Sequence, residues 1–263
     1  MVSNKIVPSE TDSSSAQPGL FRTLLKRDGW PVLAIALATV GVQLGVFLIP
    51  QAFGAERGRL VPASLIITGV WVALAAAIFA AGPCSTFSGL LRGGCVIDAT
   101  AVLLAVLWLS TPQVTFLAAV KLYCIYASVA FCAIAFARFA STLRFRYLGA
   151  VLGALILTAA QAGLFWLPGL IQLASTSEDQ SAIAAWGLRA NPLYGVFSAI
   201  AEESGFVWHY AEVMYRITPL GEDIAVGSVQ WYEPMAIWLI TAAVLATIGW
   251  GCRLIIFRSP ENR

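Results

Sequence analysis

The sequence predicts an all-α integral membrane protein with six transmembrane helices, and two observations lead to this fold class. Of the 263 residues, 59% are hydrophobic and only 11% are charged, and the mean hydropathy is +0.80, which excludes an ordinary soluble domain. Five stretches are almost purely apolar, and each has the roughly 20 residues that a helix needs to cross the hydrocarbon core of a bilayer. They are 30–50, 60–81, 94–139, 147–173 and 234–257.

The middle stretch is too long for one crossing. As a single helix, residues 94–139 would extend for about 69 Å at 1.5 Å per residue, so they must fold back on themselves. Thr111-Pro112-Gln113 supplies the turn, because proline does not continue a helix. The stretch therefore contains two spans, and the predicted set of six is 30–50, 60–81, 95–110, 113–138, 147–173 and 234–256.

The distribution of basic residues predicts the orientation of these spans. If the N-terminus is cytoplasmic, eleven lysines and arginines lie on the inner side of the membrane and four lie on the outer side. The positive-inside rule favours this arrangement. We therefore expect a multi-pass protein of a bacterial-type inner (plasma) membrane, with both termini in the cytoplasm and residues 174–233 outside.

The remaining segments complete the domain organisation. Residues 1–18 are polar and serine-rich, which predicts a disordered cytoplasmic tail. In residues 19–29, apolar side chains recur at helical spacing opposite three basic ones, which predicts either an interfacial amphipathic helix or an ordinary charged flank of the first span. Residues 30–173 then form a five-span bundle, and residues 234–263 form the sixth span and the cytoplasmic C-terminus.

The external segment, residues 174–233, predicts a hairpin of two amphipathic helices that meet at Gly205. Asn191-Pro192 supplies a cap and a first helical residue. Glu202 and Glu203 lie on the face opposite an apolar stripe. The stripe is large enough to predict an interface with the protein's own bundle, a symmetry mate or a partner chain. It consists of Leu193, Phe197, Ile200, Val207 and Trp208.

Four polar residues within the predicted spans form a candidate intramembrane site. Asp98 and Lys121 are ionisable, and such residues are costly in a bilayer unless they are paired or solvated. One alternative is an ion pair between them. The other is that Lys121 extends to the membrane surface while Asp98 is solvated near the cytoplasmic interface. Gln43 and Gln161 are expected to make hydrogen bonds between helices.

The sequence lacks the motifs of common catalytic sites. It contains neither a GxxxxGK[ST] phosphate-binding loop nor a GxSxG nucleophile motif. His209 is the single histidine, and the five cysteines form no CxxC pair, so we expect no metal site. We therefore expect a chain that is not an enzyme and that binds neither a cofactor nor nucleic acid. An intramembrane enzyme has the least support, because no acid and base have the required spacing.

The layout resembles that of the ABC-2 type exporter permease family. The shared features are six spans with both ends inside, a basic lead-in helix, a short helical connection between spans two and three, and an external hairpin before the last span. Asn191-Pro192-Leu193 resembles the signature that often precedes the last span in that family. The connection Gly82–Gly93 departs from the family, because it lacks the usual acidic run.

This resemblance implies a permease subunit of an ABC-type exporter, assembled as a homodimer or hetero-oligomer with a separate P-loop ATPase. The ATPase would contact the connection at Phe87, Leu90 and Arg92, and alternating access would move a lipid-like or hydrophobic substrate. The alternative function is a non-catalytic scaffold or anchor subunit of a larger membrane complex. That alternative explains the absence of catalytic motifs equally well, and the lipid bilayer is a partner in both.

Overall fold

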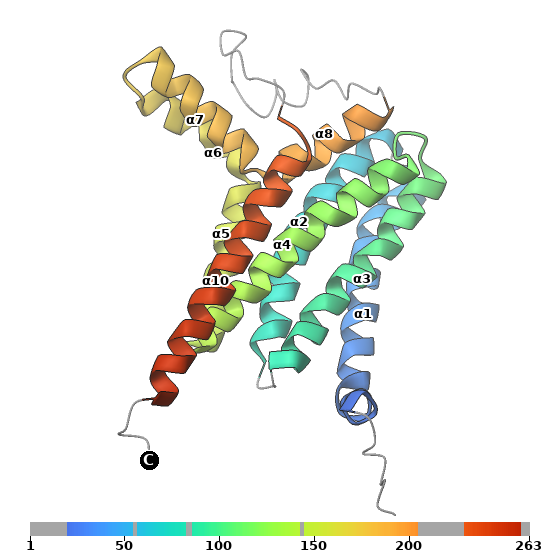
Figure 1. Ribbon diagram of the computed structural model, residues 1–263. Coiled ribbons are helices and arrows are strands. Elements are labelled where there is room, and N and C mark those ends of the chain that lie inside the picture. The colour runs from blue at the N-terminus through green and yellow to red at the C-terminus, as the bar shows by residue number, and fades with distance from the viewer. Residues whose placement is uncertain (1–19, 55–56, 83–85, 143–144, 205–228, 259–263) are drawn as a thin grey trace, which may run out of the picture.

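The computed structural model describes residues 20–54, 57–82, 86–142, 145–204 and 229–258, and all regular structure in these ranges is α-helical (Figure 1). The predicted tail, residues 1–18, lies outside the described residues. The helices are α1 (Leu20–Ala52), α2 (Arg57–Ala81), α3 (Thr86–Ser110), α4 (Phe116–Thr142), α5 (Arg146–Gln161), α6 (Gly163–Leu173), α7 (Ser177–Arg189), α8 (Pro192–Ser204) and α10 (Tyr232–Arg258).

Five helices in the described part of the chain are long and apolar enough to cross a membrane, namely α1, α2, α3, α4 and α10. The start of α1 and the end of α10 lie at the same end of the bundle, which we call the foot (Figure 1). The opposite end, which we call the head, carries α6, α7 and α8. The structure thus confirms an all-α fold suited to several membrane crossings. The predicted sixth crossing is not confirmed in the described part of the chain, because α5 is a shorter apolar helix of 16 residues.

Helix α4 is the centre of the bundle and packs against α2, α3, α5, α8 and α10. Small residues bring the helix backbones together, as is usual where helices associate in a membrane. On α5, a Cβ atom at Gly149 would overlap the Cβ of Ala140, and one at Gly153 would overlap Phe136. The two glycines of the GAVLG sequence therefore let α5 approach α4 closely.

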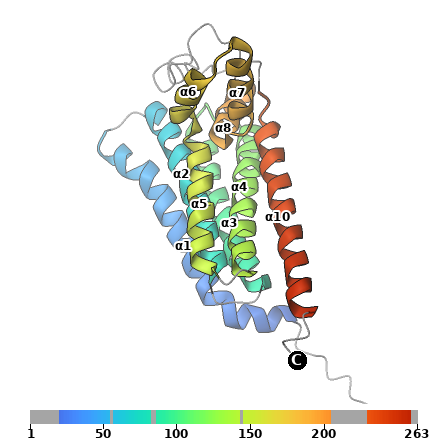
Figure 2. The ribbon, with the colours of Figure 1, turned by 90° about the vertical axis from the view of Figure 1, so that its left-hand side faces the viewer.

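The first turns of α1 run in a different direction from the rest of the helix. Figure 2 shows them crossing the foot before α1 turns upward along the bundle. Pro31 lies inside α1, and proline both removes a backbone hydrogen bond and crowds the preceding turn, so a bend is expected in this part of the helix. An interfacial helix lies in the plane of the membrane surface, so the predicted helix over residues 19–29 would have to cross the foot in this way.

Two boundaries differ from the sequence predictions, and the first concerns the third span. Helix α3 begins at Thr86, well before the predicted start at residue 95. Phe87, Leu90 and Arg92 therefore belong to the first turns of a spanning helix and not to a separate connection. The run has no proline after Pro83, so nothing in the sequence interrupts the helix there.

The second difference is the fifth span, because the prediction of one helix over residues 147–173 is wrong. The chain forms α5 and α6, with a break after Gln161. Asn191 Nδ2 donates a hydrogen bond to the Gln161 carbonyl at 3.2 Å, and Trp166 Nε1 donates to the Ala159 carbonyl at 2.7 Å. Side chains that replace backbone donors in this way are an established cause of helix kinks.

A further helix, α7, is not predicted by the sequence analysis, because its first turns are polar. Its cap is Thr176, whose hydroxyl accepts a hydrogen bond from the Asp179 backbone N–H at 3.1 Å. Ala184 and Leu188 are buried against α6. Helices α6 and α7 therefore form a hairpin at the head (Figure 1). The predicted meeting of two helices at Gly205 lies outside the described residues.

Candidate functional site

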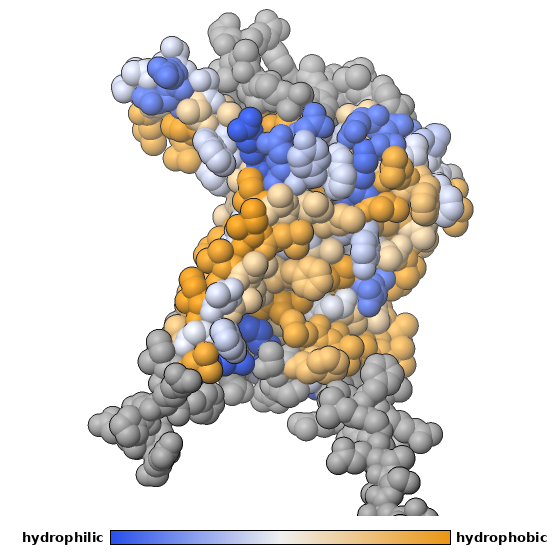
Figure 3. All heavy atoms as spheres, in the orientation of Figure 1, coloured by the Kyte–Doolittle hydropathy of each residue, from blue (hydrophilic) through white to orange (hydrophobic). Residues whose placement is uncertain are grey.

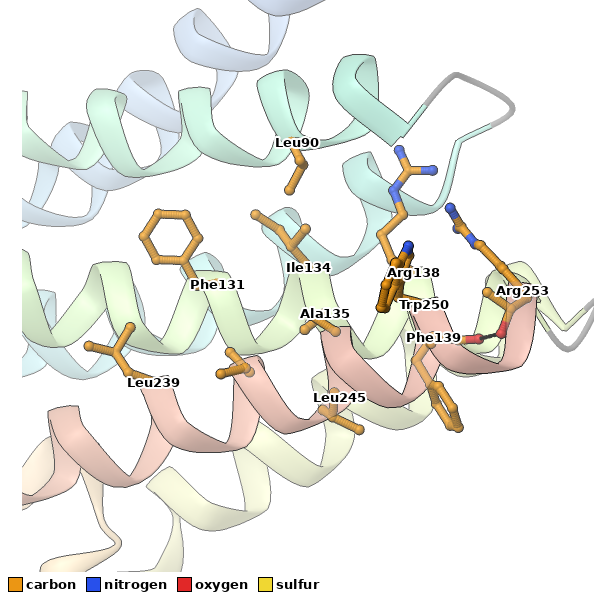
Figure 4. Close-up of a pocket in the computed structure, with 15 residues that line it drawn as sticks. Leu90, Phe131, Ile134, Ala135, Arg138, Phe139, Leu239, Leu245, Trp250 and Arg253 are labelled. Carbon is orange, nitrogen blue, oxygen red and sulfur yellow. Dashed lines mark hydrogen bonds between the residues drawn. The ribbon is translucent and has the colours of Figure 1, made fainter. Parts of the chain in front are cut away.

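A cavity of about 470 Å³ lies between α4 and α10 in the foot half of the bundle. Its volume is in the range of about 300–1,000 Å³ that is typical of small-molecule sites. Most of its lining comes from the two long helices, and Leu90 of α3 closes one side (Figure 4). We call it the α4–α10 cavity.

Short residues of α10 line the middle of the cavity, between larger α10 side chains such as Leu239 and Arg253. Ala242, Ala243, Ala246 and Gly249 contribute little volume between the two helices. At Gly249 the helices approach closely, since a Cβ atom there would lie 3.7 Å from the Phe139 Cα. The larger side chains of α4 alone do not fill the space that remains.

The two ends of the cavity differ in polarity. Arg138 and Arg253 lie together with Trp250 at the end nearest the foot, whereas Phe131 and Leu239 lie toward the other end (Figure 4). Among the described residues that line the cavity, none is acidic. Figure 3 shows the same pattern on the surface, with hydrophilic atoms at the foot below a broad apolar band. The cavity is therefore apolar along its length and cationic at one end.

Arg138 also connects the cavity to the start of α3. Its guanidinium lies against Gly89, so closely that a Cβ atom on this glycine would overlap it. The next residue, Leu90, lines the cavity itself. Phe87 and Leu90 are both exposed in the first turns of α3. A displacement of these turns would therefore change both the cavity wall and the position of the guanidinium.

A separate polar cluster lies at the head, where α8 crosses α4. Lys121 Nζ is 3.0 Å from Glu202 Oε2, donates a hydrogen bond to Glu203 Oε1, and lies 5.4 Å from the centre of the Trp231 ring. The side chains of Lys121 and Glu203 are 9% and 17% exposed, whereas that of Glu202 is 48% exposed. This cluster joins α8 to the central helix through an ion pair that is largely removed from water.

The predicted ion pair between Lys121 and Asp98 is wrong. The side chain of Lys121 is buried and contacts Glu202 and Glu203 of α8 instead of Asp98. The alternative position of Lys121 at a membrane surface stays a prediction. Asp98 is exposed on α3, where its Oδ1 accepts a hydrogen bond from the Tyr123 hydroxyl at 3.3 Å. Glu203 is 82 residues away from Lys121 in the sequence, so helical spacing could not identify it as the partner.

The two glutamines of the candidate intramembrane site lie in different places. Gln43 Nε2 donates to Thr100 Oγ1 at 2.9 Å and joins α1 to α3. Gln161 Nε2 donates to the Gly69 carbonyl at 3.1 Å and joins α5 to α2. Both side chains thus make the interhelical hydrogen bonds expected of them. The four polar residues of the candidate site are not brought together into one site.

The apolar stripe predicted for the external hairpin covers the protein's own bundle. Leu193, Phe197 and Ile200 are each no more than 8% exposed, and α8 packs against α4 and α10. These three residues are therefore unavailable to a partner chain. Asn191 caps α8 as predicted, because its Oδ1 accepts a hydrogen bond from the Tyr194 backbone N–H at 3.1 Å. Val207 and Trp208 of the stripe lie outside the described residues.

Sequence reasoning missed the residues that give the α4–α10 cavity its character. Arg138 and Arg253 enter the sequence analysis only as charges that favour a cytoplasmic location. Both lie near the ends of spans predicted to finish on the same side of the membrane, which is the one available signal. That signal does not show which helices are neighbours. No family model, curated protein or solved structure matches this chain, so its function must be inferred from the geometry alone.

Proposed function

We propose that the chain is the membrane permease subunit of an ABC-type exporter, which works with a separate ATPase and moves a lipid-like or hydrophobic substrate. The observation that best supports this proposal is the asymmetry of the bundle. An apolar cavity lies at the foot, whereas α8 covers the head and is held there by Lys121. Alternating access requires a site that one side can reach while the other side is closed.

The same proposal assigns the foot to the cytoplasm of a bacterial-type inner membrane. Arg92, Arg138 and Arg253 lie in the helix turns at the foot, and the positive-inside rule places such residues in the cytoplasm. Helix α5 then supplies the sixth crossing. Its 16 residues extend for about 24 Å, and α6 continues the path toward the outer surface. Both termini are then cytoplasmic.

The first turns of α3 are the proposed contact with the ATPase. Phe87 and Leu90 present apolar surface at the foot, which suits docking of a soluble subunit. Because Leu90 lines the cavity and Gly89 packs against Arg138, a push on these turns would reshape the cavity directly. This contact gives a physical path from nucleotide hydrolysis to the substrate site.

Two copies of the chain complete the proposed exporter. Helix α10 packs on α4 and α8 but leaves most of its surface uncovered, including Ile240, Val244 and Ile248. This surface faces either lipid or a second copy, and the ATPase subunits associate with the foot of each copy.

A site-specific photo-crosslinker at Phe87 tests the proposal in cells of the native host. We expect it to capture a protein that a radiolabelled ATP analogue also labels, and we expect the purified complex to hydrolyse ATP. The same crosslinker at Ser181 of α7, at the head, is the matched control and should capture no such protein. If the folded, purified chain carries no nucleotide-binding partner and no ATP hydrolysis, the exporter proposal is wrong and the scaffold or anchor function is favoured.

A further inference from the structure

Asp98 is the middle residue of α3, which is one of the helices suited to crossing a membrane. It is 12 residues from each end of the helix, or about 18 Å, whereas the hydrocarbon core is about 30 Å thick in total. The side chain is exposed on the bundle surface, and Figure 3 shows a small group of hydrophilic atoms that interrupts the apolar band over α3. A carboxylate at this depth is costly in a bilayer, so such residues mark functional sites and need a partner.

The described part of the chain gives Asp98 one hydrogen bond and no counter-ion. The Tyr123 hydroxyl donates to Oδ1 at 3.3 Å, and a neutral donor does not compensate the charge. Lys121, two residues from Tyr123 on α4, is bound instead by Glu202 and Glu203 of α8. The carboxylate is therefore available to a cation that approaches from outside the bundle.

A groove of about 310 Å³ lies between α3 and α4, directly on the head side of Asp98. Its volume is at the lower end of the range typical of small-molecule sites. Short side chains of both helices line it, namely Ala101 and Ala105 of α3 and Ala119 of α4. Tyr123 lines the groove and also donates to Asp98, so the carboxylate lies at the foot end. We call this feature the α3–α4 groove.

Aromatic side chains lie at both ends of the α3–α4 groove. Trp108 and Phe116 are at the head end, where their ring centres are 5.2 Å apart in an edge-to-face arrangement. Tyr123 is at the foot end, beside Asp98. None of the described residues that line the groove is charged. Apolar walls accommodate a hydrophobic body, and aromatic faces attract cations within about 6 Å. The chemistry of the groove thus favours a ligand that is apolar and positively charged.

We propose that the α3–α4 groove binds a lipophilic cation, with its ammonium or phosphonium group beside Asp98 and its apolar body between α3 and α4. The ligand compensates the carboxylate, and its body takes the place of lipid along the two helices. This site goes beyond the proposed exporter, because it lies outside the α4–α10 cavity and its occupation requires no ATPase. The two proposals can therefore fail separately.

Equilibrium binding of radiolabelled tetraphenylphosphonium to the purified chain in a neutral detergent tests the charge. Tetraphenylborate is the matched probe, because it has the same shape and the opposite charge. Asp98→Asn keeps an oxygen that can accept from Tyr123 but removes the negative charge. We expect this variant to bind the phosphonium at least tenfold more weakly, which corresponds to about 1.4 kcal/mol, and to bind the borate no more weakly. Glu178→Gln, a matched loss of charge in the exposed first turn of α7, should leave both affinities unchanged.

A pair of tryptophan substitutions on α3 tests the location. Ala105 lines the groove, whereas Val102 is exposed and does not line it. We expect Ala105→Trp to weaken phosphonium binding at least tenfold and Val102→Trp to leave it unchanged. Undetectable binding to the folded wild-type chain, equal losses for the two probes in Asp98→Asn, or equal effects of the two tryptophan substitutions would overturn the proposal. A chain that binds the phosphonium as expected but carries no ATPase would keep the groove as a site and refute only the exporter.

Discussion

The ion-pair cluster between α4 and α8 makes a specific prediction about the stability of the head. Replacing Lys121 by methionine keeps the length of the side chain but removes the cation that binds Glu202 and Glu203. Glu203 is 17% exposed, so its carboxylate would remain largely removed from water next to a second carboxylate. We therefore expect Lys121→Met to loosen α8 from the bundle.

The size of the effect follows from the exposure of the three groups. Breaking a buried ion pair costs about 3–5 kcal/mol, because one charge is left without its partner, whereas an exposed pair contributes at most about 1 kcal/mol. Lys121 and Glu203 are near the buried limit, and Glu202, at 48% exposure, is near the exposed limit. We expect a loss of about 2–3 kcal/mol, which lowers the melting temperature by about 5–10 °C.

The assay is thermal unfolding of the purified chain in nanodiscs, extended to a double-mutant cycle. We expect Glu203→Gln to destabilise the protein and Glu202→Gln to have a small effect. The double variant Lys121→Met/Glu203→Gln should recover about 1–2 kcal/mol of the summed loss, because the two residues interact. If the two single losses add without recovery, the Lys121–Glu203 pair does not hold α8 in place.

Three further predictions concern the helix ends, the packing and the orientation. Asn191→Ala removes the cap of α8 and should lower stability by about 1–2 kcal/mol in the same unfolding assay. Gly149→Leu should prevent α5 from packing on α4 and reduce the yield of folded protein, whereas Gly41→Leu, where nothing lies within 4 Å of an added Cβ, should be tolerated. Cysteine introduced at Ser181 should react with an impermeant reagent from outside the cell and cysteine at Phe87 only from inside, and the reverse pattern would refute the orientation.

The spanning helices could be predicted from the sequence because their signal is local. A long apolar run is sufficient evidence for a span, whatever the run contacts, since the bilayer imposes the same requirement on every helix. The Asn191 cap is local in the same sense, because its acceptor oxygen and the backbone N–H of Tyr194 are three residues apart. These features follow from the sequence without knowledge of helix neighbours.

The candidate sites could not be predicted in the same way, because they depend on which helices meet. Helix α4 contains no acidic residue that could pair with Lys121, and its partner Glu203 lies on α8. The break after Gln161 likewise depends on Asn191, which is 30 residues away in the sequence. In the α4–α10 cavity, the short side chains of α10 contribute to a cavity only because they lie opposite α4. Apolar composition describes each helix but not its neighbours.

The broken helix has a consequence for the order in which the protein is made. The Gln161 carbonyl lies at the end of α5 and is bonded by Asn191, which leaves the ribosome later. A backbone carbonyl without a partner costs several kcal/mol in hydrocarbon. Helix α5 therefore cannot reach its final state in the membrane when it is first inserted. It must wait for the start of α8, which is synthesised only after α6 and α7.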